Sequence, residues 1–155
     1  MTISEIIVDA CNRNGVPDFA NKVKYKFSKK MTVCGGKARL TQNLVVFGVA
    51  VWEAATPEQR TNIVYHEACH LIAYHKFGRM SLADGPHGWR WKSCMIKCGQ
   101  NPARTHSVKV ERRPMKEVEC DCGIRYMGLT RYHRLISGEQ TYYCRNCNKN
   151  VVPVT

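Results

Sequence analysis

The residues with the clearest capacity for chemistry are His66, Glu67 and His70, which form the pattern His-Glu-x-x-His. Positions four apart lie on the same face of a helix, so both imidazoles can reach one metal ion. Glu67 directly follows the first histidine and is placed to hold and deprotonate a water molecule on that metal. Zinc lowers the pKa of such a water from about 15.7 to about 7, so the pattern predicts zinc-dependent hydrolysis at neutral pH.

A helix is predicted around this motif. Thr56 is suited to the N-cap, Pro57 to the first helical position and Gln59 to the capping box. Apolar residues recur at helical spacing along the segment, and the ring of His75 extends their stripe. Gly78 is suited to a left-handed cap at the helix end. The motif is therefore expected in the middle of a buried helix of about six turns.

A catalytic zinc needs a third protein ligand and an open coordination position. The candidates are His75, Asp84, His87 and His106. His75 is excluded, because five residues place it about 140° around the helix from His70. His87 lies in a turn rich in glycine and proline before a second predicted helix, and a ligand delivered from such a turn is sterically reasonable. We expect His87 as the third ligand, with Asp84 and His106 as alternatives.

A second candidate metal site lies near the C-terminus. It consists of the last four of nine cysteines: Cys120, Cys122, Cys144 and Cys147. Two cysteine pairs separated by a gap of 21 residues are typical of a zinc ribbon. The alternatives are four unrelated buried cysteines or a redox dithiol. A unit of about 40 residues is too small to fold by burial alone, so its metal should contribute to folding.

The other five cysteines show no disulfide framework. No secretory signal precedes them and no apolar run approaches the length of a membrane span, so a reducing cytoplasm is expected. Cys94 and Cys98 are interpreted as core residues. Cys69 lies inside the motif, points away from the two histidine ligands and is also interpreted as a packing residue.

Taken together, these residues resemble the SprT-like family of zinc metalloproteases, a pattern shared by bacterial SprT proteins and the eukaryotic DNA–protein crosslink protease Spartan. The resemblance covers most of the chain from about Met31 onward. It rests on the His66 to His70 motif, Phe77-Gly78-Arg79, Pro86-His87-Gly88-x-x-Trp91, Pro102-Ala103-Arg104-x-His106, Cys120-x-Cys122, Arg131-Tyr132-His133-Arg134, Gly138-Glu139 and Tyr143-Cys144-x-x-Cys147.

The resemblance implies specific roles. His66, His70 and His87 would be the ligands of a catalytic zinc and Glu67 the catalytic base. It also supports the zinc ribbon, although the first cysteine pair is Cys-x-Cys and not the more usual Cys-x-x-Cys. One departure is the insertion-like segment of residues 81–84, which bears on the shape of the cleft rim.

The predicted fold class is α+β. Residues 1–113 are expected to form a zincin-like domain, in which a small sheet lies beside the motif helix, and residues 114–155 a small β zinc ribbon. Further expected elements are a helix at residues 1–11, a strand at 22–27, a hairpin of residues 31–34 and 38–40 about Gly35 and Gly36, and a buried strand at 44–52.

The net charge of +12 is unevenly distributed. No acidic residue occurs between Asp18 and Glu53, whereas seven lysines and arginines do, and residues 90–116 hold eight basic residues and one acid. Such stretches attract polyanions, although they also serve solubility. We expect DNA binding, to single strands at least as well as to duplex, with contacts from Arg131, Tyr132 and Arg134.

These observations predict a cytoplasmic zinc metalloprotease, nucleoid-associated if the chain is bacterial, with one catalytic and one structural zinc ion. Its substrates would be proteins bound to DNA, and no membrane partner is expected. The main alternative is a nucleic-acid-binding zinc protein whose protease site is quiescent or vestigial. A small-molecule zinc hydrolase is a third reading. The presence of Glu67 favours an enzyme, because a purely structural metal site needs no base.

Overall fold

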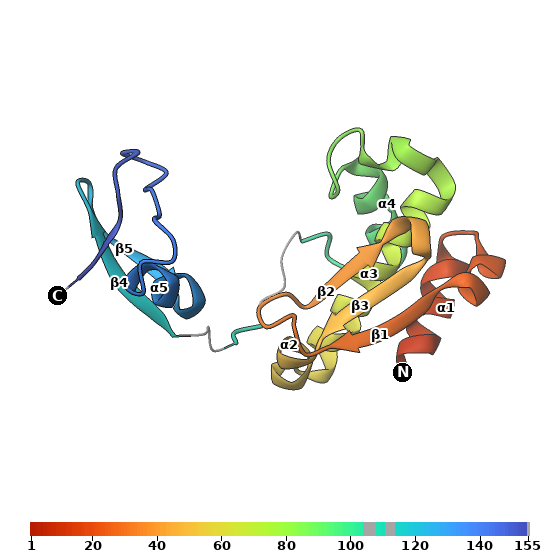
Figure 1. The fold of residues 1–155 in the computed structure, drawn as a ribbon. Coiled ribbons are helices and arrows are strands. Elements are labelled where there is room, and N and C mark those ends of the chain that lie inside the picture. The colour runs from red at the N-terminus through yellow and green to blue at the C-terminus, as the bar shows by residue number, and fades with distance from the viewer. Residues whose placement is uncertain (104–107, 111–113, 155) are drawn as a thin grey trace. The chain divides into compact units, whose positions relative to one another are not determined.

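The computed structural model describes residues 1–103, 108–110 and 114–154 (Figure 1). The chain divides into two compact units, Met1–Val110 and Glu111–Thr155. Each unit combines at least one helix with a small sheet, so the prediction of an α+β chain is confirmed. The predicted boundary at residue 113 falls at residues 111–113, which lie outside the described residues. His106, an alternative third ligand, also lies outside them.

The N-terminal unit is built on a three-stranded mixed sheet of β1 (Lys24–Ser28), β2 (Gly36–Arg39) and β3 (Leu44–Gly48) (Figure 1). The strand order is β1-β3-β2, with β1 parallel and β2 antiparallel to β3. The central strand β3 is buried from its second residue onward, as its nearly continuous apolar sequence requires. The sheet therefore leaves β2 as an edge strand.

The predicted hairpin about Gly35 and Gly36 is wrong. Residues 31–34 form no strand, and β2 pairs with β3 in the register Gly36 to Phe47. The backbone N–H of Gly48 donates a hydrogen bond to the carbonyl of Gly35 at 3.1 Å. The segment crosses the end of β3 closely, since a Cβ at Gly48 would lie 2.3 Å from the carbonyl oxygen of Cys34. Gly35 and Gly36 therefore lead into an edge strand.

The predicted strand at residues 44–52 is too long. It ends at Gly48, and the next residues form a short helix, α2 (Val49–Ala54). An apolar run alone does not distinguish a buried strand from a buried helix, which explains the error. Val51 is fully buried, and the Trp52 ring packs 5.2 Å from that of Phe47. The apolar residues of the segment 44–52 therefore pack into one core, first from a strand and then from a helix.

The motif helix α3 spans Pro57–Phe77, and the predicted capping box is confirmed. Thr56 accepts a hydrogen bond from the Gln59 N–H, and the Gln59 side chain accepts one from the Thr56 N–H. Gly78 has a φ of 54° but a ψ of −140°, so it ends the helix outside the left-handed helical region that we expected. His75 is exposed, and its ring stacks on that of the buried Phe19 with 4.1 Å between the ring centroids.

The core of this unit forms between α3, α1 (Ile3–Arg13), α4 (Trp89–Lys97) and the sheet. Two hydrogen bonds also link α1 and its C-cap to α3. The Tyr65 hydroxyl donates one to the Asp9 carboxylate at 2.6 Å, and the Lys76 ammonium donates the other to the Asn14 carbonyl at 2.9 Å. Cys69, Cys94 and Cys98 are buried in this core, which confirms their interpretation as core residues. The motif helix is therefore fixed from three sides.

The C-terminal unit contains β4 (Met115–Cys120), β5 (Gly123–Gly128), α5 (Leu129–Ile136) and β6 (Val152–Pro153). The strands form an antiparallel sheet in the order β5-β4-β6. The helix α5 was not predicted from the sequence. The small core of the C-terminal unit consists of Val118, Cys120, Cys144 and Val151. So small a core buries little apolar surface, and a bound metal ion would add to the folding free energy of this unit.

Among the described residues, none of the helices combines the length and the apolar character that crossing a bilayer requires.

Candidate metal centres and catalytic residues

Three imidazoles converge at one point of the N-terminal unit. His66 and His70 lie one turn apart on α3, and His87 lies in the turn before α4. The Nε2 atom of His87 lies 3.0 Å from Nε2 of His66 and 3.2 Å from Nε2 of His70. The sequence analysis proposed these three residues as ligands, and the structure brings them together.

The turn that carries His87 depends on two glycines. Gly85 has a φ of 82°, a conformation that L-residues rarely adopt. A Cβ at Gly88 would lie 2.7 Å from Cβ of Asp84, so the turn can close only with glycine at this position. The alternative ligand Asp84 is half exposed and lies 3.5 Å from the Arg90 guanidinium, outside the histidine group.

The histidine cluster fits zinc in both geometry and protonation. At Zn–N distances of about 2.0–2.1 Å, tetrahedral ligand atoms lie about 3.3 Å apart, close to the observed separations. Burial, and then the neighbouring His66 and His87, lower the pKa of His70 from 6.5 to about 3. The half-buried imidazole of His70 is therefore neutral, which is the form that binds a metal.

Trp91 supports all three imidazoles, and the sequence analysis gave it no role in the site. Its ring centroid lies 4.7 Å from that of His66, 5.3 Å from His70 and 4.6 Å from His87. Its indole N–H donates to the His66 carbonyl at 3.2 Å, and only 1% of the residue is exposed. Its place in the pattern Pro86-His87-Gly88-x-x-Trp91, four residues after His87, is a signal that could have identified it.

Glu67 lies next to this cluster and is almost fully buried. Burial raises the pKa of its carboxyl from 4.5 to about 7, while a hydrogen bond from the Ala38 N–H opposes this increase. A general base is most effective when its pKa lies near the working pH. A hollow of about 240 Å³ is lined by Gly36, Lys37, Ala38, Leu40, Glu67, His70, Leu82 and Pro86. Leu82 belongs to the segment of residues 81–84 in which the chain departs from the family pattern, so this segment does contribute to the rim.

The four C-terminal cysteines also come together. The Sγ atom of Cys122 lies 3.3 Å from that of Cys120 and 3.6 Å from that of Cys144. Cys120 ends β4, and Cys144 and Cys147 lie in the loop between α5 and β6. Four sulfur atoms within 4.8 Å of one another form a donor set suited to a structural zinc ion.

The surroundings of Cys122 and Cys144 favour the thiolate, which is the form that binds metal, whereas burial raises the pKa of Cys120 to about 12. The backbone N–H groups of Cys147 and Asn146 lower the pKa of Cys144 from 9.0 to about 6. The Arg125 guanidinium donates a hydrogen bond to the Cys122 sulfur at 3.2 Å. The pKa of Cys122 is lowered most by its hydrogen bond with the Cys120 thiol and next by this bond from Arg125. The sequence analysis did not identify Arg125 as a residue of this site.

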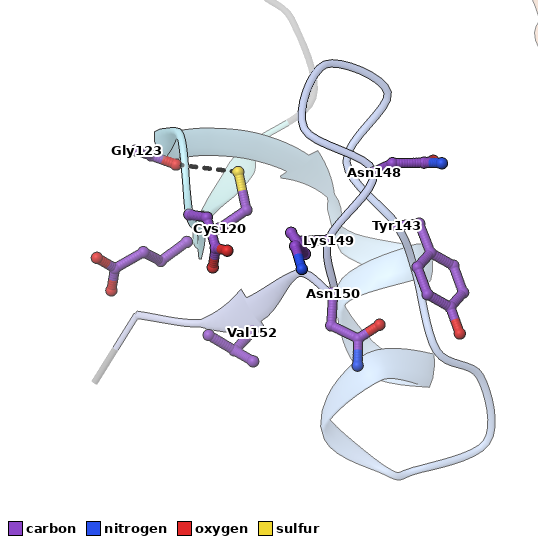
Figure 2. A pocket seen from close by; sticks show the side chains of 9 residues that line it. Cys120, Gly123, Tyr143, Asn148, Lys149, Asn150 and Val152 are labelled. Carbon is purple, nitrogen blue, oxygen red and sulfur yellow. Dashed lines mark hydrogen bonds between the residues drawn. The ribbon is translucent and has the colours of Figure 1, made fainter.

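A hollow of about 710 Å³ lies beside Cys120 (Figure 2). The carboxylates of Glu119 and Asp121 line it together with the ammonium of Lys149 and the side chains of Tyr143, Asn148 and Asn150. Acidic groups thus outnumber basic ones here. This side of the C-terminal unit is unlike the basic stretches that suggested DNA binding.

The three residues proposed to contact DNA lie on α5. Arg131 and Arg134 are exposed, and the guanidinium of Arg134 lies 3.9 Å from the Glu139 carboxylate. Tyr132 is half-buried and packs against the small core, so only part of its ring can meet a base. Tyr126 and Tyr143 are exposed aromatic residues of this unit, and neither was proposed from the sequence as a DNA contact.

Comparison with known proteins gives consistent results. The family model for the SprT-like family matches residues 5–113. Several curated relatives carry the name Protein SprT. The one from Shewanella oneidensis is 30% identical over 119 residues, which cover 75% of this chain and 74% of the relative. Those from Vibrio atlanticus and Pectobacterium carotovorum are 32% and 36% identical, covering 83% and 57% of this chain and 75% and 52% of the relatives.

Proposed function

The chain belongs to the SprT-like family, and from this premise and the site geometry we propose that it is a zinc metallopeptidase acting on DNA-associated proteins. The observation that carries the proposal is the convergence of three imidazole Nε2 atoms beside a buried carboxylate. We infer a zincin-like arrangement, because a small sheet lies beside the helix that carries His66 and His70.

The proposed mechanism assigns separate roles to the residues of the site. His66, His70 and His87 would hold the zinc ion, which supplies a Lewis acid for the peptide carbonyl and the attacking water. Glu67 takes a proton from that water as general base and passes it to the leaving amine as general acid. In the metal-free protein burial raises the pKa of Glu67 to about 7, and a bound zinc ion would favour its carboxylate, which is the form that accepts the proton.

The wall of the site comes from the edge strand β2 on one side and from Leu82 and Pro86 on the other. An edge strand can accept an extended peptide through main-chain hydrogen bonds. This favours an unfolded or extended protein segment as substrate over a small molecule. A small-molecule hydrolase needs no such strand.

The DNA part of the proposal rests on charge. The net charge is +12, and the stretch from Asp18 to Glu53 contains seven basic residues and no acid between these two positions. Arg131 and Arg134 on α5 offer two further exposed guanidinium groups. The same charge also favours the second candidate function, a nucleic-acid-binding zinc protein with a quiescent site. Glu67 favours the enzyme, because binding DNA does not require a buried carboxylate beside three imidazoles.

A digestion assay separates the two candidates. The zinc-loaded protein is incubated with casein or histones, with and without single-stranded DNA, and compared with Glu67→Gln. Glutamine keeps the shape of the side chain but cannot accept a proton, so cleavage should fall about 10²–10⁴-fold while zinc is retained. DNA binding with no cleavage by the unaltered chain would favour the quiescent protein. Undiminished cleavage by Glu67→Gln would refute the assigned base.

A further inference from the structure

The strand β2 and the side chain of Glu67 fit one another closely. A Cβ at Gly36 would lie 2.5 Å from Cγ of Glu67, 2.8 Å from Cδ and 2.9 Å from Oε1. Real Cβ atoms essentially never approach other atoms within 3.0 Å. Glu67 therefore occupies the space that any other residue at position 36 would fill.

Glycine at this position is not required by the backbone. The φ of Gly36 lies outside the left-handed region, unlike that of Gly85, so an L-residue could adopt its conformation. Lack of space remains as the reason for glycine. The residue that occupies this space is the proposed catalytic base.

The same strand also binds the carboxylate. The backbone N–H of Ala38 donates a hydrogen bond to Glu67. A hydrogen bond to a buried carboxylate is stronger than one between neutral groups, and it selects one orientation of a flexible side chain. Gly36 and Ala38 thus hold Glu67 by shape and by hydrogen bonding.

The position of β2 is itself fixed by the core. Gly36 pairs with Phe47 and Ala38 with Val45 on β3, and these two β3 residues are 0% and 1% exposed. Lys37 and Arg39 are exposed and, as alternate residues of a strand, face the other way. The contact with Glu67 therefore rests on a rigid element, as a preorganised site requires.

We propose that β2 is a positioning element for Glu67, in which the bare Cα of Gly36 makes room for its side chain and the Ala38 N–H aims its carboxylate into the hollow that contains His70. The consequence for catalysis rests on the proposed function. The contact between β2 and Glu67 does not rest on the proposed function, and it can be tested without any substrate.

The experiment is a double-variant cycle on the full, zinc-loaded chain. The variants are Gly36→Ala, Glu67→Ala and the two combined, with Gly128→Ala as a matched control, because a Cβ at Gly128 meets no atom within 4 Å. The readouts are the thermal midpoint and the chemical shift of the Ala38 amide proton in ¹H–¹⁵N spectra. The hydrogen bond to a carboxylate should hold that proton downfield.

Gly36→Ala should lower the thermal midpoint and move the Ala38 amide upfield, as Glu67→Ala does. In the Glu67→Ala background, the added methyl meets open space, so Gly36→Ala should change neither quantity. Gly128→Ala should leave the Ala38 amide unchanged. If Gly36→Ala is insoluble, a soluble combined variant still supports the proposal, whereas an insoluble one overturns it. An unmoved Ala38 amide in Gly36→Ala, or an equal effect in both backgrounds, also overturns it.

Activity gives a separate arm. If the unaltered chain cleaves protein, Gly36→Ala should lower kcat by about 10²-fold with little change in KM and with both zinc ions retained, since a displaced base weakens chemistry more than binding. Equal activity of Gly36→Ala and the unaltered chain would overturn the positioning role. If the unaltered chain cleaves nothing, the proposed function fails, and the spectra and thermal midpoints still decide whether β2 holds Glu67.

Discussion

Replacing Glu67 by glutamine should stabilise the metal-free N-terminal unit, and the gain should depend on pH. Burial raises the pKa of this carboxyl from 4.5 to about 7 in the folded protein. Between these values the folded state binds more protons than the unfolded state, so stability falls as pH rises. The contribution of Glu67 is therefore fully present below about pH 4.5 and is lost as pH rises through 7.

The size of the effect follows from the pKa shift. At 1.36 kcal/mol per pKa unit, the rise from 4.5 to about 7 corresponds to about 3 kcal/mol at pH 8. His70 acts in the opposite direction, because its pKa is lowered from 6.5 to about 3 and its contribution is lost as pH falls. That effect is common to both proteins and cancels in their difference. Glutamine can still accept the Ala38 hydrogen bond, so the difference isolates the charge.

The assay is urea unfolding of the two proteins between pH 5 and 8 after removal of metal with a chelator, since a bound dication would favour the carboxylate. Tryptophan fluorescence reports the N-terminal unit alone, because Trp52, Trp89 and Trp91 all lie in it. Exposed Glu53→Gln is the matched control and should show no such pH-dependent gain. A difference that stays constant from pH 5 to 8, or that favours the unaltered chain at pH 8, would refute the reasoning.

Three further outcomes are expected. Elemental analysis should find two zinc ions per chain and about one in His87→Ala; two in that variant would remove His87 from the site. Cys147→Ser should lose the other zinc ion, and circular dichroism should show that its C-terminal unit is unfolded. The unfolding transition reported by tryptophan fluorescence should remain, and its loss would show that the two units do not fold independently. Fluorescence anisotropy between about 50 and 200 mM salt should show DNA binding that weakens with salt, with a slope shallower by about 1.4 on single strands for Arg131→Ala combined with Arg134→Ala. A flat salt response would mean that the basic charge serves solubility, and stronger binding to duplex than to single strands would argue against base stacking.

The parts of the site that could be predicted are those encoded by local spacing. His66 and His70 share a face because they are four residues apart on a helix, and Thr56 with Gln59 marks where that helix begins. His87 could be anticipated because glycine and proline around it require a turn. Each inference needs only a few consecutive residues.

The parts that could not be predicted depend on distant partners. Gly36 resembled a hairpin glycine, but its contact is with Glu67, 31 positions further along the chain. The Ala38 N–H that binds the same carboxylate is a backbone group, and a sequence does not reveal its direction. Tyr132 resembled a base-stacking residue, yet it packs on the core with Leu135, three residues later on α5. That spacing was a helical signal that the sequence analysis did not use.

The order in which the ligands occur along the chain has a consequence for how the protein assembles. His66 and His87 are separated by 21 positions, so the entire histidine group lies in α3 and in the residues that connect α3 to α4. Closing so short a loop has a low entropic cost, and contacts of low sequence separation form early. The cysteine group lies wholly within the other unit. Each unit therefore carries its own candidate metal-binding group, and during synthesis the whole histidine group is present before the last cysteine has been made.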